Sequence, residues 1–293
     1  AENSAEPFAR AERLFSIRMG ARVTDKSHEG LKWVMRAGYG ARGVIYSIVG
    51  GLAFLAAFKS TQASGTKDAL AALRDEPYGV PALFAIGLGL LAYLVWRVAA
   101  GVKDVEDHGT DLKGIVARLG QITTGLIHGG IGIAVFALAL SGKNSGGDTT
   151  QDWTQKLMAM PAGRYIVAAG ALILLGAGVY YAYKGWSGKY KGHLARTQFT
   201  ESIDPIVTVG LVIYGIMLAL VAFSLGYAAL TANPEQAGGL GKALQDLRGM
   251  AFGRFLLGGA GLGLIGFAVY NFVEAGYRVV PKFSDPDIRT LLD

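Results

Sequence analysis

Cysteine is absent from this chain and charged residues are scarce. None of the 293 residues is cysteine and only 17% are charged, against roughly 25% in soluble globular domains. The missing cysteines exclude a disulfide scaffold and cysteine-ligated zinc or iron–sulfur sites. The hydrophobic content of 52% excludes intrinsic disorder. A positive mean hydropathy of +0.36 and long apolar blocks indicate an α-helical membrane protein.

Known catalytic and cofactor motifs are missing as well. The sequence contains no His-Glu-x-x-His, no Gly-x-Ser-x-Gly and no phosphate-binding loop. Only one of the four histidines, His128, falls within an apolar segment, so a bis-histidine haem lacks a second ligand. We therefore expect no enzymatic activity, no metal and no cofactor. The basic residues form no nucleic-acid-binding motif, and we expect no nucleic-acid partner.

Six apolar segments are long enough to span a bilayer, because about 20 mainly apolar residues cross roughly 30 Å of hydrocarbon as a helix. They are residues 38–58, 80–100, 116–140, 164–183, 206–230 and 254–275. The distribution of lysine and arginine predicts orientation, since cytoplasmic loops carry the excess. Nineteen of the 28 basic residues fall in the two tails and in the second and fourth connections. We therefore expect both termini in the cytoplasm.

A two-span unit is repeated three times. Residues 34–46 align with residues 116–128 at a constant offset of 82 positions. Glycine or an aromatic residue recurs at matching positions of the units: Gly38, Gly120 and Gly210; Gly43, Gly125 and Gly215; Trp96, Tyr180 and Tyr270. Each unit also carries a short amphipathic segment between its spans (68–73, 152–157 and 242–247), which we place at the membrane interface.

The repeats predict the fold. Two spans return the chain to the side where it started, so consecutive units share one orientation and are parallel repeats. We predict an all-α fold of six transmembrane helices in a bundle with pseudo-three-fold symmetry. Its parts are an amphipathic N-terminal tail, three repeats and an extended C-terminal tail: residues 1–33, 34–107, 108–192, 193–280 and 281–293. The N-terminal tail suits a helix on the cytoplasmic leaflet or a docking segment for a partner.

The start of the first unit, Arg36-Ala-Gly-Tyr-Gly-Ala-Arg-Gly43, resembles a bacterial family known only as domain of unknown function 1206. The second unit keeps the ends of this pattern in residues 118–125, and the third keeps only the glycines. The resemblance covers about residues 30–282. It implies three tandem two-helix repeats in the bacterial inner membrane, and it carries no activity and no catalytic residue.

Glycine is the most distinctive residue within the spans. The chain has 43 glycines, about twice the usual frequency of roughly 7%. Lipid provides no hydrophobic force between helices, so small residues help by allowing close backbone approach. We expect helix packing, within the bundle or against a partner helix, at Gly43, Gly125, Gly129, Gly215, Gly259 and Gly263.

Polar residues inside the spans are candidate functional sites, because burying them in a membrane is costly. We predict that His128 donates a hydrogen bond across a helix contact; a single-ligand haem or pigment and a proton relay are alternatives. Lys184 and Glu274 occupy matching positions at the ends of their spans, where they either snorkel to the interface or pair with each other. Asn271 and Glu274 share a helical face, which makes them the nearest approach to a cation site.

The leading functional hypothesis is a non-catalytic inner-membrane protein that acts as an accessory or scaffolding subunit. A compact glycine-packed bundle with sparse buried charge and long polar ends motivates it. Membrane lipids and either a protein partner or a second copy of the chain are the expected partners. Two alternatives stay open: a small-solute or ion channel or carrier along the bundle axis, and a lipid- or quinone-binding membrane module.

Overall fold

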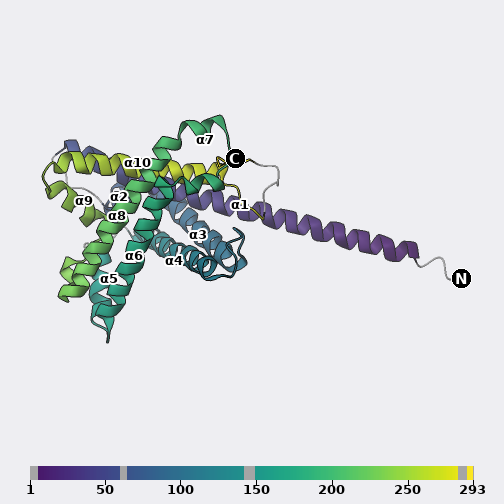
Figure 1. The fold of residues 1–293 in the computed structure, drawn as a ribbon, viewed down its shortest axis with the longest axis horizontal. Coiled ribbons are helices and arrows are strands. Elements are labelled where there is room, and N and C mark those ends of the chain that lie inside the picture. The colour runs from purple at the N-terminus through teal and green to yellow at the C-terminus, as the bar shows by residue number, and fades with distance from the viewer. Residues whose placement is uncertain (1–5, 60–64, 142–148, 283–288, 293) are drawn as a thin grey trace.

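The computed structural model describes residues 6–59, 65–141, 149–282 and 289–292, and these form an all-helical fold (Figure 1). Six helices of this described part are long and apolar enough to cross a membrane, which makes the chain a multi-pass membrane protein. They are α1 (Glu6–Phe58), α3 (Gly79–Lys103), α4 (Leu112–Ser141), α6 (Gly163–Trp186), α8 (Asp204–Thr231) and α10 (Gly253–Tyr277). Each of the six predicted spans lies within one of these helices.

In each repeat, one short amphipathic helix connects the two spans. The three helices are α2 (Thr66–Arg74), α5 (Thr149–Met158) and α9 (Leu240–Gly249). These helices confirm the segments predicted at 68–73, 152–157 and 242–247. The remaining short elements are η1 (Lys189–His193) and α7 (Gln198–Ser202) between the second and third repeats, and η2 (Pro234–Gln236) before α9.

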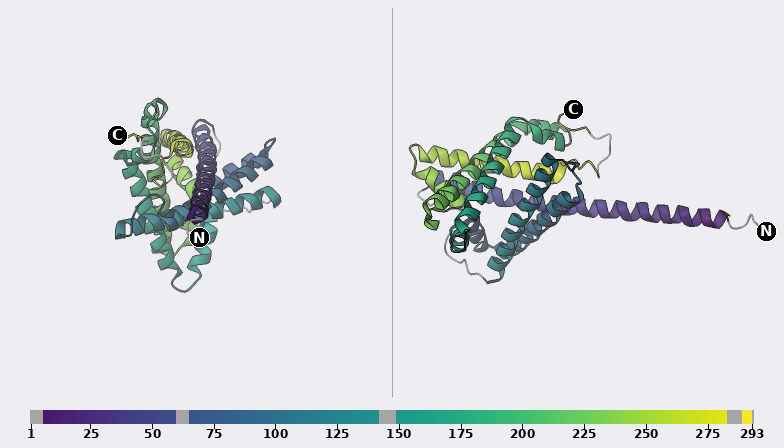
Figure 2. Two further views of the ribbon diagram at one scale, coloured as in Figure 1. Left: turned by 90° about the vertical axis from the view of Figure 1, so that its right-hand side faces the viewer. Right: turned by 60° about the horizontal axis from the view of Figure 1, so that its bottom comes forward.

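The long helices pack mainly as three antiparallel pairs, each joining two repeats. The pairs are α1 with α10, α3 with α4, and α6 with α8. Figure 1 shows α1 and α10 side by side, crossed by the α6–α8 pair, and Figure 2 shows the three pairs running in clearly different directions. Glycines in register allow the close pairing: a Cβ on Gly215 would lie 2.5 Å from the Gly178 carbonyl oxygen, and one on Gly125 would lie 2.9 Å from the Arg97 Cβ.

The two long helices of one repeat pack against each other in the first and third repeats but not in the second. Helix α1 packs on α3 in the first repeat, and α8 packs on α10 in the third. The corresponding pair of the second repeat, α4 and α6, is not among the helix pairs that pack together in the described part of the chain. The predicted pseudo-three-fold arrangement is therefore an open ring, with five packed interfaces and a gap in the second repeat.

A shared turn starts the second span of every repeat. The residue before the helix takes a left-handed conformation at Tyr78, Ala162 and Phe252, with φ of 66°, 58° and 60°. A glycine follows each time, and a Cβ on it would overlap a carbonyl of the preceding amphipathic helix: Gly79 on Leu73, Gly163 on Leu157 and Gly253 on Arg248. Only glycine fits so close an approach, because a Cβ would collide with the carbonyl oxygen.

The N-terminal tail differs from the expected arrangement. The N-terminal segment is not a separate surface helix: it continues into the first span as the 53-residue helix α1, which extends far beyond the bundle (Figure 1). Residues 1–5 of the predicted tail lie outside the described residues, as do residues 283–288 and 293 of the C-terminal one. Within the described part, the Arg196 N–H donates to the Arg289 carbonyl and the Leu291 N–H to the Leu194 carbonyl, so residues 289–291 lie against the segment that precedes α7.

Candidate functional site

The open side of the second repeat is the clearest departure from internal symmetry, and we call it the α4–α6 seam. It is the face of α4 around Gly120 together with the face of α6 around Ile173, Gly176 and Tyr180. In the third repeat the matching glycines pack together, with a Cβ on Gly266 meeting the Gly210 Cα at 3.1 Å. A Cβ on Gly120 or on Gly176 would meet no described atom within 4 Å.

Exposure of matched side chains confirms the opening. Trp96 and Tyr270 are 0% and 3% exposed, whereas Tyr180 at the same position of the second repeat is 56% exposed. On the α4 side of the opening, a Cβ on Gly125 would lie 2.9 Å from the Arg97 Cβ. A charged residue of the bundle interior therefore packs against one of the seam helices.

One substitution explains why this interface is open. Gly89 and Gly263 occupy matching positions in α3 and α10, and a Cβ on either would collide with the neighbouring helix of its own repeat, at Ala41 and Ile213 respectively. The second repeat has Ile173 at this position, and its side chain is 67% exposed. A branched side chain in place of a contact glycine keeps the two backbones apart.

An arginine surrounded by aromatic rings lies at the centre of the bundle. Arg42 of α1 is 1% exposed, and its Nη1 donates to the Tyr93 hydroxyl at 2.8 Å. Its guanidinium carbon lies 4.7 Å from the Tyr93 ring centre and 5.5 Å from that of Phe267. Such cation–π contacts contribute about 0.5–2 kcal/mol each. Within the described residues, Arg42 forms no ion pair, and its Nε and Nη2 atoms have no hydrogen-bond acceptor.

The rings around Arg42 also contact side chains of the seam helices. His128 of α4 packs edge-on to Tyr93 with ring centres 5.1 Å apart. Tyr181 of α6 packs edge-on to Phe267 at 5.9 Å. The seam therefore ends inward at the aromatic cage that holds Arg42.

A buried ionic cluster lies beside this cage, at the end of the bundle where α10 finishes. Glu106, in the turn between α3 and α4, forms an ion pair with Arg278, with the charged atoms 2.8 Å apart, and Arg97 lies 3.8 Å away. Arg278 also pairs with Glu274 of its own helix end. The cluster joins the α3–α4 turn to α10, and so holds the first and third repeats together.

Glu106 stays ionised within this cluster. Burial alone would raise the pKa of its carboxyl. The positive charge of Arg278, the hydrogen bond from His108 and the positive charge of Arg97 outweigh that effect and hold the pKa well below its ordinary value. The Gln121 side chain of α4 adds a donor, with Nε2 at 2.9 Å from the Glu106 oxygen. Gln121 thus ties α4 to the same cluster.

The predicted polar residues are buried, and the structure brings three of them close together. Lys184 donates to the Tyr270 hydroxyl at 2.9 Å, and Glu274 pairs with Arg278, so neither snorkels and the two do not pair directly. Asn271 donates to the Phe267 carbonyl of its own helix at 2.7 Å. No group of three or more histidine, cysteine or acidic residues in the described ranges is placed to hold a metal.

His128 makes its hydrogen bond within α4 instead of across a helix contact. Its Nδ1 lies 2.8 Å from the Thr124 carbonyl oxygen. A carbonyl only accepts, so Nδ1 carries the proton and the other ring nitrogen is the acceptor. This bond fixes the ring against Tyr93, which makes His128 part of the cage wall.

Five of the six predicted glycines contact a neighbouring helix. Gly43 meets the ring of Phe272, Gly129 meets Leu94 and Gly263 meets Ile213, while Gly125 and Gly215 pack as described above. Gly259 is the exception, because a Cβ there would meet no described atom within 4 Å. The contact on that helix is made by Gly261, which lies against the backbone of Phe54.

Sequence reasoning missed the charged centre. Arg42 and Arg97 lie near the ends of predicted spans, where topology alone explains arginine. Arg278 counted only as a basic residue of the C-terminal tail, and Glu106 was not singled out. A usable signal existed at Arg42, because the matching positions of the other repeats are Thr124 and Tyr214. A charge present in one repeat and replaced in the others indicates a role outside the common scaffold.

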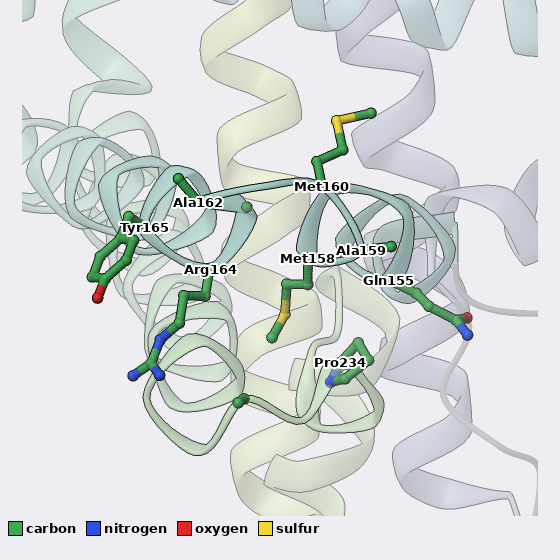
Figure 3. Close-up of a pocket in the computed structure, with 10 residues that line it drawn as sticks. Gln155, Met158, Ala159, Met160, Ala162, Arg164, Tyr165 and Pro234 are labelled. Carbon is green, nitrogen blue, oxygen red and sulfur yellow. The ribbon is translucent and has the colours of Figure 1, made fainter.

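A separate hollow of about 440 Å³ lies at the opposite end of the bundle (Figure 3). It is formed where α5, the start of α6 and η2 meet, with Met158 pointing toward Pro234 and Met160 pointing away. Arg164 is its charged residue, and the guanidinium carbon lies 5.6 Å from the Tyr165 ring centre. No buried polar group of the described lining points into it, so we assign it no function.

Comparison with known proteins agrees with the internal repeats. The family model described as Domain of Unknown Function (DUF1206) matches residues 37–104, 119–188 and 209–278. The chain is also 27% identical over 263 residues to the uncharacterized protein YxxB of Bacillus subtilis (strain 168), covering 88% of this chain and 95% of that protein. No solved structure matches. Since the three matches together cover more than half of its residues, the chain belongs to the DUF1206 family.

Proposed function

We propose that this protein is a non-catalytic lipid-binding module of the bacterial inner membrane, with both termini in the cytoplasm. The observation that carries the proposal is the α4–α6 seam. One interface of a repeated bundle is open, and it exposes helix faces that are covered in the other two repeats. An acyl chain suits this gap, because the exposed side chains of the seam are largely apolar.

The filled centre of the bundle argues against a channel along its axis. Trp96, Tyr93 and Phe267 are each at most 1% exposed, and Arg42 lies among them. A solute following the axis would have to displace these rings, whereas a lipid entering from the side would not. Lateral binding is therefore the better supported alternative.

A second candidate function is that of an accessory or scaffolding subunit. The specific observation in its favour is that Gly120 and Gly176 lie uncovered in helix-packing register. A transmembrane helix of another protein, or of a second copy, would pack closely on such faces. Lipid and helix would compete for the same seam, so one experiment distinguishes them.

The test uses a matched pair of substitutions on α6. Ile173→Gly restores the glycine that both other repeats have at this position, and it should let α4 approach α6. Leu172→Gly is the control, since Leu172 and its counterparts Leu88 and Leu262 are all exposed. Both substitutions weaken the helix similarly, by about 1 kcal/mol.

Native mass spectrometry of protein purified in mild detergent provides the measurement. We expect the wild type and Leu172→Gly to retain a tightly bound lipid, and Ile173→Gly to lose it. Equal lipid content in all three proteins would contradict the proposal. A stoichiometric protein retained in place of lipid, and lost in Ile173→Gly, would support the scaffolding function instead.

A further inference from the structure

Buried charge in the bundle is unbalanced. Four cations lie in or beside the cage and the ionic cluster, namely Arg42, Arg97, Lys184 and Arg278, and each is at most 13% exposed. They face two buried anions, Glu106 and Glu274. The formal surplus is two positive charges. An uncompensated charge in a low-dielectric interior is costly, so such a surplus calls for an anionic partner.

Several of the buried donors also have no acceptor. Nε of Arg42, Nε of Arg97, Nε of Arg278 and Nη2 of Arg42 lack a hydrogen-bond partner within the described structure. The guanidinium group presents its donors as a planar fork that matches the oxygens of a carboxylate or phosphate. The chemistry that would satisfy these atoms is therefore an oxyanion.

Arg97 is the cation that a ligand in the seam would reach first. Its side chain is 13% exposed, whereas those of Arg278 and Glu106 are 3% and 4% exposed. The nearest acid, Glu106, is 3.8 Å away, which is too long for a hydrogen bond. Arg97 packs on α4, one of the two seam helices, because a Cβ on Gly125 would lie 2.9 Å from the Arg97 Cβ. Arg42 lies near the same Tyr93 ring as Arg97, with guanidinium carbons 4.7 and 5.8 Å from the ring centre, and adds positive potential there.

We propose that the seam binds an anionic phospholipid, with its phosphate oxygens on the Arg97 guanidinium and its acyl chains between α4 and α6. This inference rests on the proposed lipid-binding function and adds the chemistry of the head group. The charge surplus lies at the end of the bundle that carries both chain termini. Phospholipid of the leaflet at that end is the source to which the proposal commits.

The first experiment measures the head-group preference of the wild type. The purified protein is delipidated and titrated with phosphatidylglycerol or phosphatidylcholine of identical acyl chains in nanodiscs, and retained lipid is counted by native mass spectrometry. We expect phosphatidylglycerol to be retained on the order of tenfold more strongly. Equal retention of the two lipids would overturn this inference while leaving the lipid-binding function standing.

Substitutions at Arg97 test whether this residue causes the preference for phosphatidylglycerol. Arg97→Gln should reduce it to below about twofold, and Arg97→Lys, which keeps the charge and loses the planar fork, should give an intermediate value. Arg254→Gln is the control, because Arg254 is an exposed residue at the other end of α10. An unchanged preference in both Arg97 variants would overturn the assignment to Arg97, and the wild-type comparison stands even if Arg97→Gln does not fold.

Two further measurements distinguish lipid from free phosphate as the ligand, and the seam from other binding sites. Inorganic phosphate at millimolar concentration should not displace phosphatidylglycerol, since the acyl chains supply part of the binding; full displacement would show a free-anion site. Ile173→Gly should abolish phosphatidylglycerol retention. If it kept the full preference, the lipid would bind outside the seam, and the proposed function would fail although the anion preference remained.

Discussion

The second and third repeats share two matched packing glycines and yet form different structures. Gly210 and Gly266 bring α8 against α10, whereas their counterparts Gly120 and Gly176 face no neighbouring helix within the described structure. The difference teaches that a small residue permits close helix approach without enforcing it. The neighbouring position decides the outcome, because Gly263 admits Ile213 in the third repeat and Ile173 replaces that glycine in the second.

The largest expected effect concerns what holds the open ring together. Glu106→Gln should destabilise the fold by about 3–5 kcal/mol, because it leaves Arg278 and Arg97 buried without their acid. Thermal unfolding in detergent, followed by circular dichroism, measures the loss. Glu201→Gln removes the exposed partner of Arg196 and should cost at most about 1 kcal/mol. Similar losses in both variants would show that the buried cluster does not hold the repeats together.

Matched glycine substitutions test the comparison directly. Gly210→Leu should destabilise the protein by about 1–3 kcal/mol or more, because the new side chain collides with the backbone of Gly266 and Phe267. Gly120→Leu should be neutral or slightly stabilising, since its side chain would meet open space and leucine favours the helix. Melting temperatures in one detergent provide the measurement. Equal destabilisation would mean that the seam is closed in the membrane.

The matched tyrosines offer a smaller contrast. Tyr270→Phe removes the acceptor of the buried Lys184 ammonium group and should cost about 1.5–3 kcal/mol. Tyr180→Phe changes an exposed hydroxyl and should cost less than about 0.5 kcal/mol. The two melting temperatures, compared with that of the wild type, measure the difference. A larger loss at Tyr180 than at Tyr270 would place the second repeat, and not the third, in the packed state.

The smallest expected effect is a dependence on pH at the junction between the second and third repeats. Burial, followed by the charges of Arg278 and Lys184, lowers the pKa of His193 from 6.5 to about 4. Between these values the unfolded chain binds a proton that the folded chain does not, so stability falls as pH drops below 6.5 and the loss is complete near pH 4. At pH 5, about 1.5 pH units below the unfolded-state pKa, the loss is about 2 kcal/mol.

His193→Gln removes this titration. Between pH 7 and pH 5, the melting temperature of the variant should therefore fall less than that of the wild type. His108→Gln is a useful comparison, because it removes a histidine of the neighbouring ionic cluster. An identical pH dependence in wild type and His193→Gln would show that another group controls acid stability.

Helices, spans and repeats were predictable because each depends on local sequence. Hydrocarbon requires every backbone polar group to be satisfied within its own segment, so a run of apolar residues specifies a helix almost by itself. The turn before each even-numbered span also depends on local sequence, because a glycine follows it in all three repeats, at Gly79, Gly163 and Gly253. Five of the six glycines expected at helix contacts lie at one, whereas Gly259, which forms a Gly-x-x-x-Gly pattern with Gly263, faces no neighbouring helix within the described structure.

The candidate site was less predictable, because its members come from different repeats. Arg42 looked like an ordinary charge at the end of a span, and its burial depends on rings supplied by Tyr93 and Phe267, far away in the chain. Glu106 looked like a loop residue until Arg278 was placed against it. These side chains acquire their roles from neighbours that no local pattern identifies.

The amino-acid order alone determined six membrane-crossing helices in three like-facing copies, since apolar length and repeat spacing are local properties in a solvent without water. Tertiary structure decided which helices pair across copies, where the ring stays open, and that an arginine lies among aromatic rings at its centre. Those outcomes depend on the shape and charge of surfaces that meet only after folding.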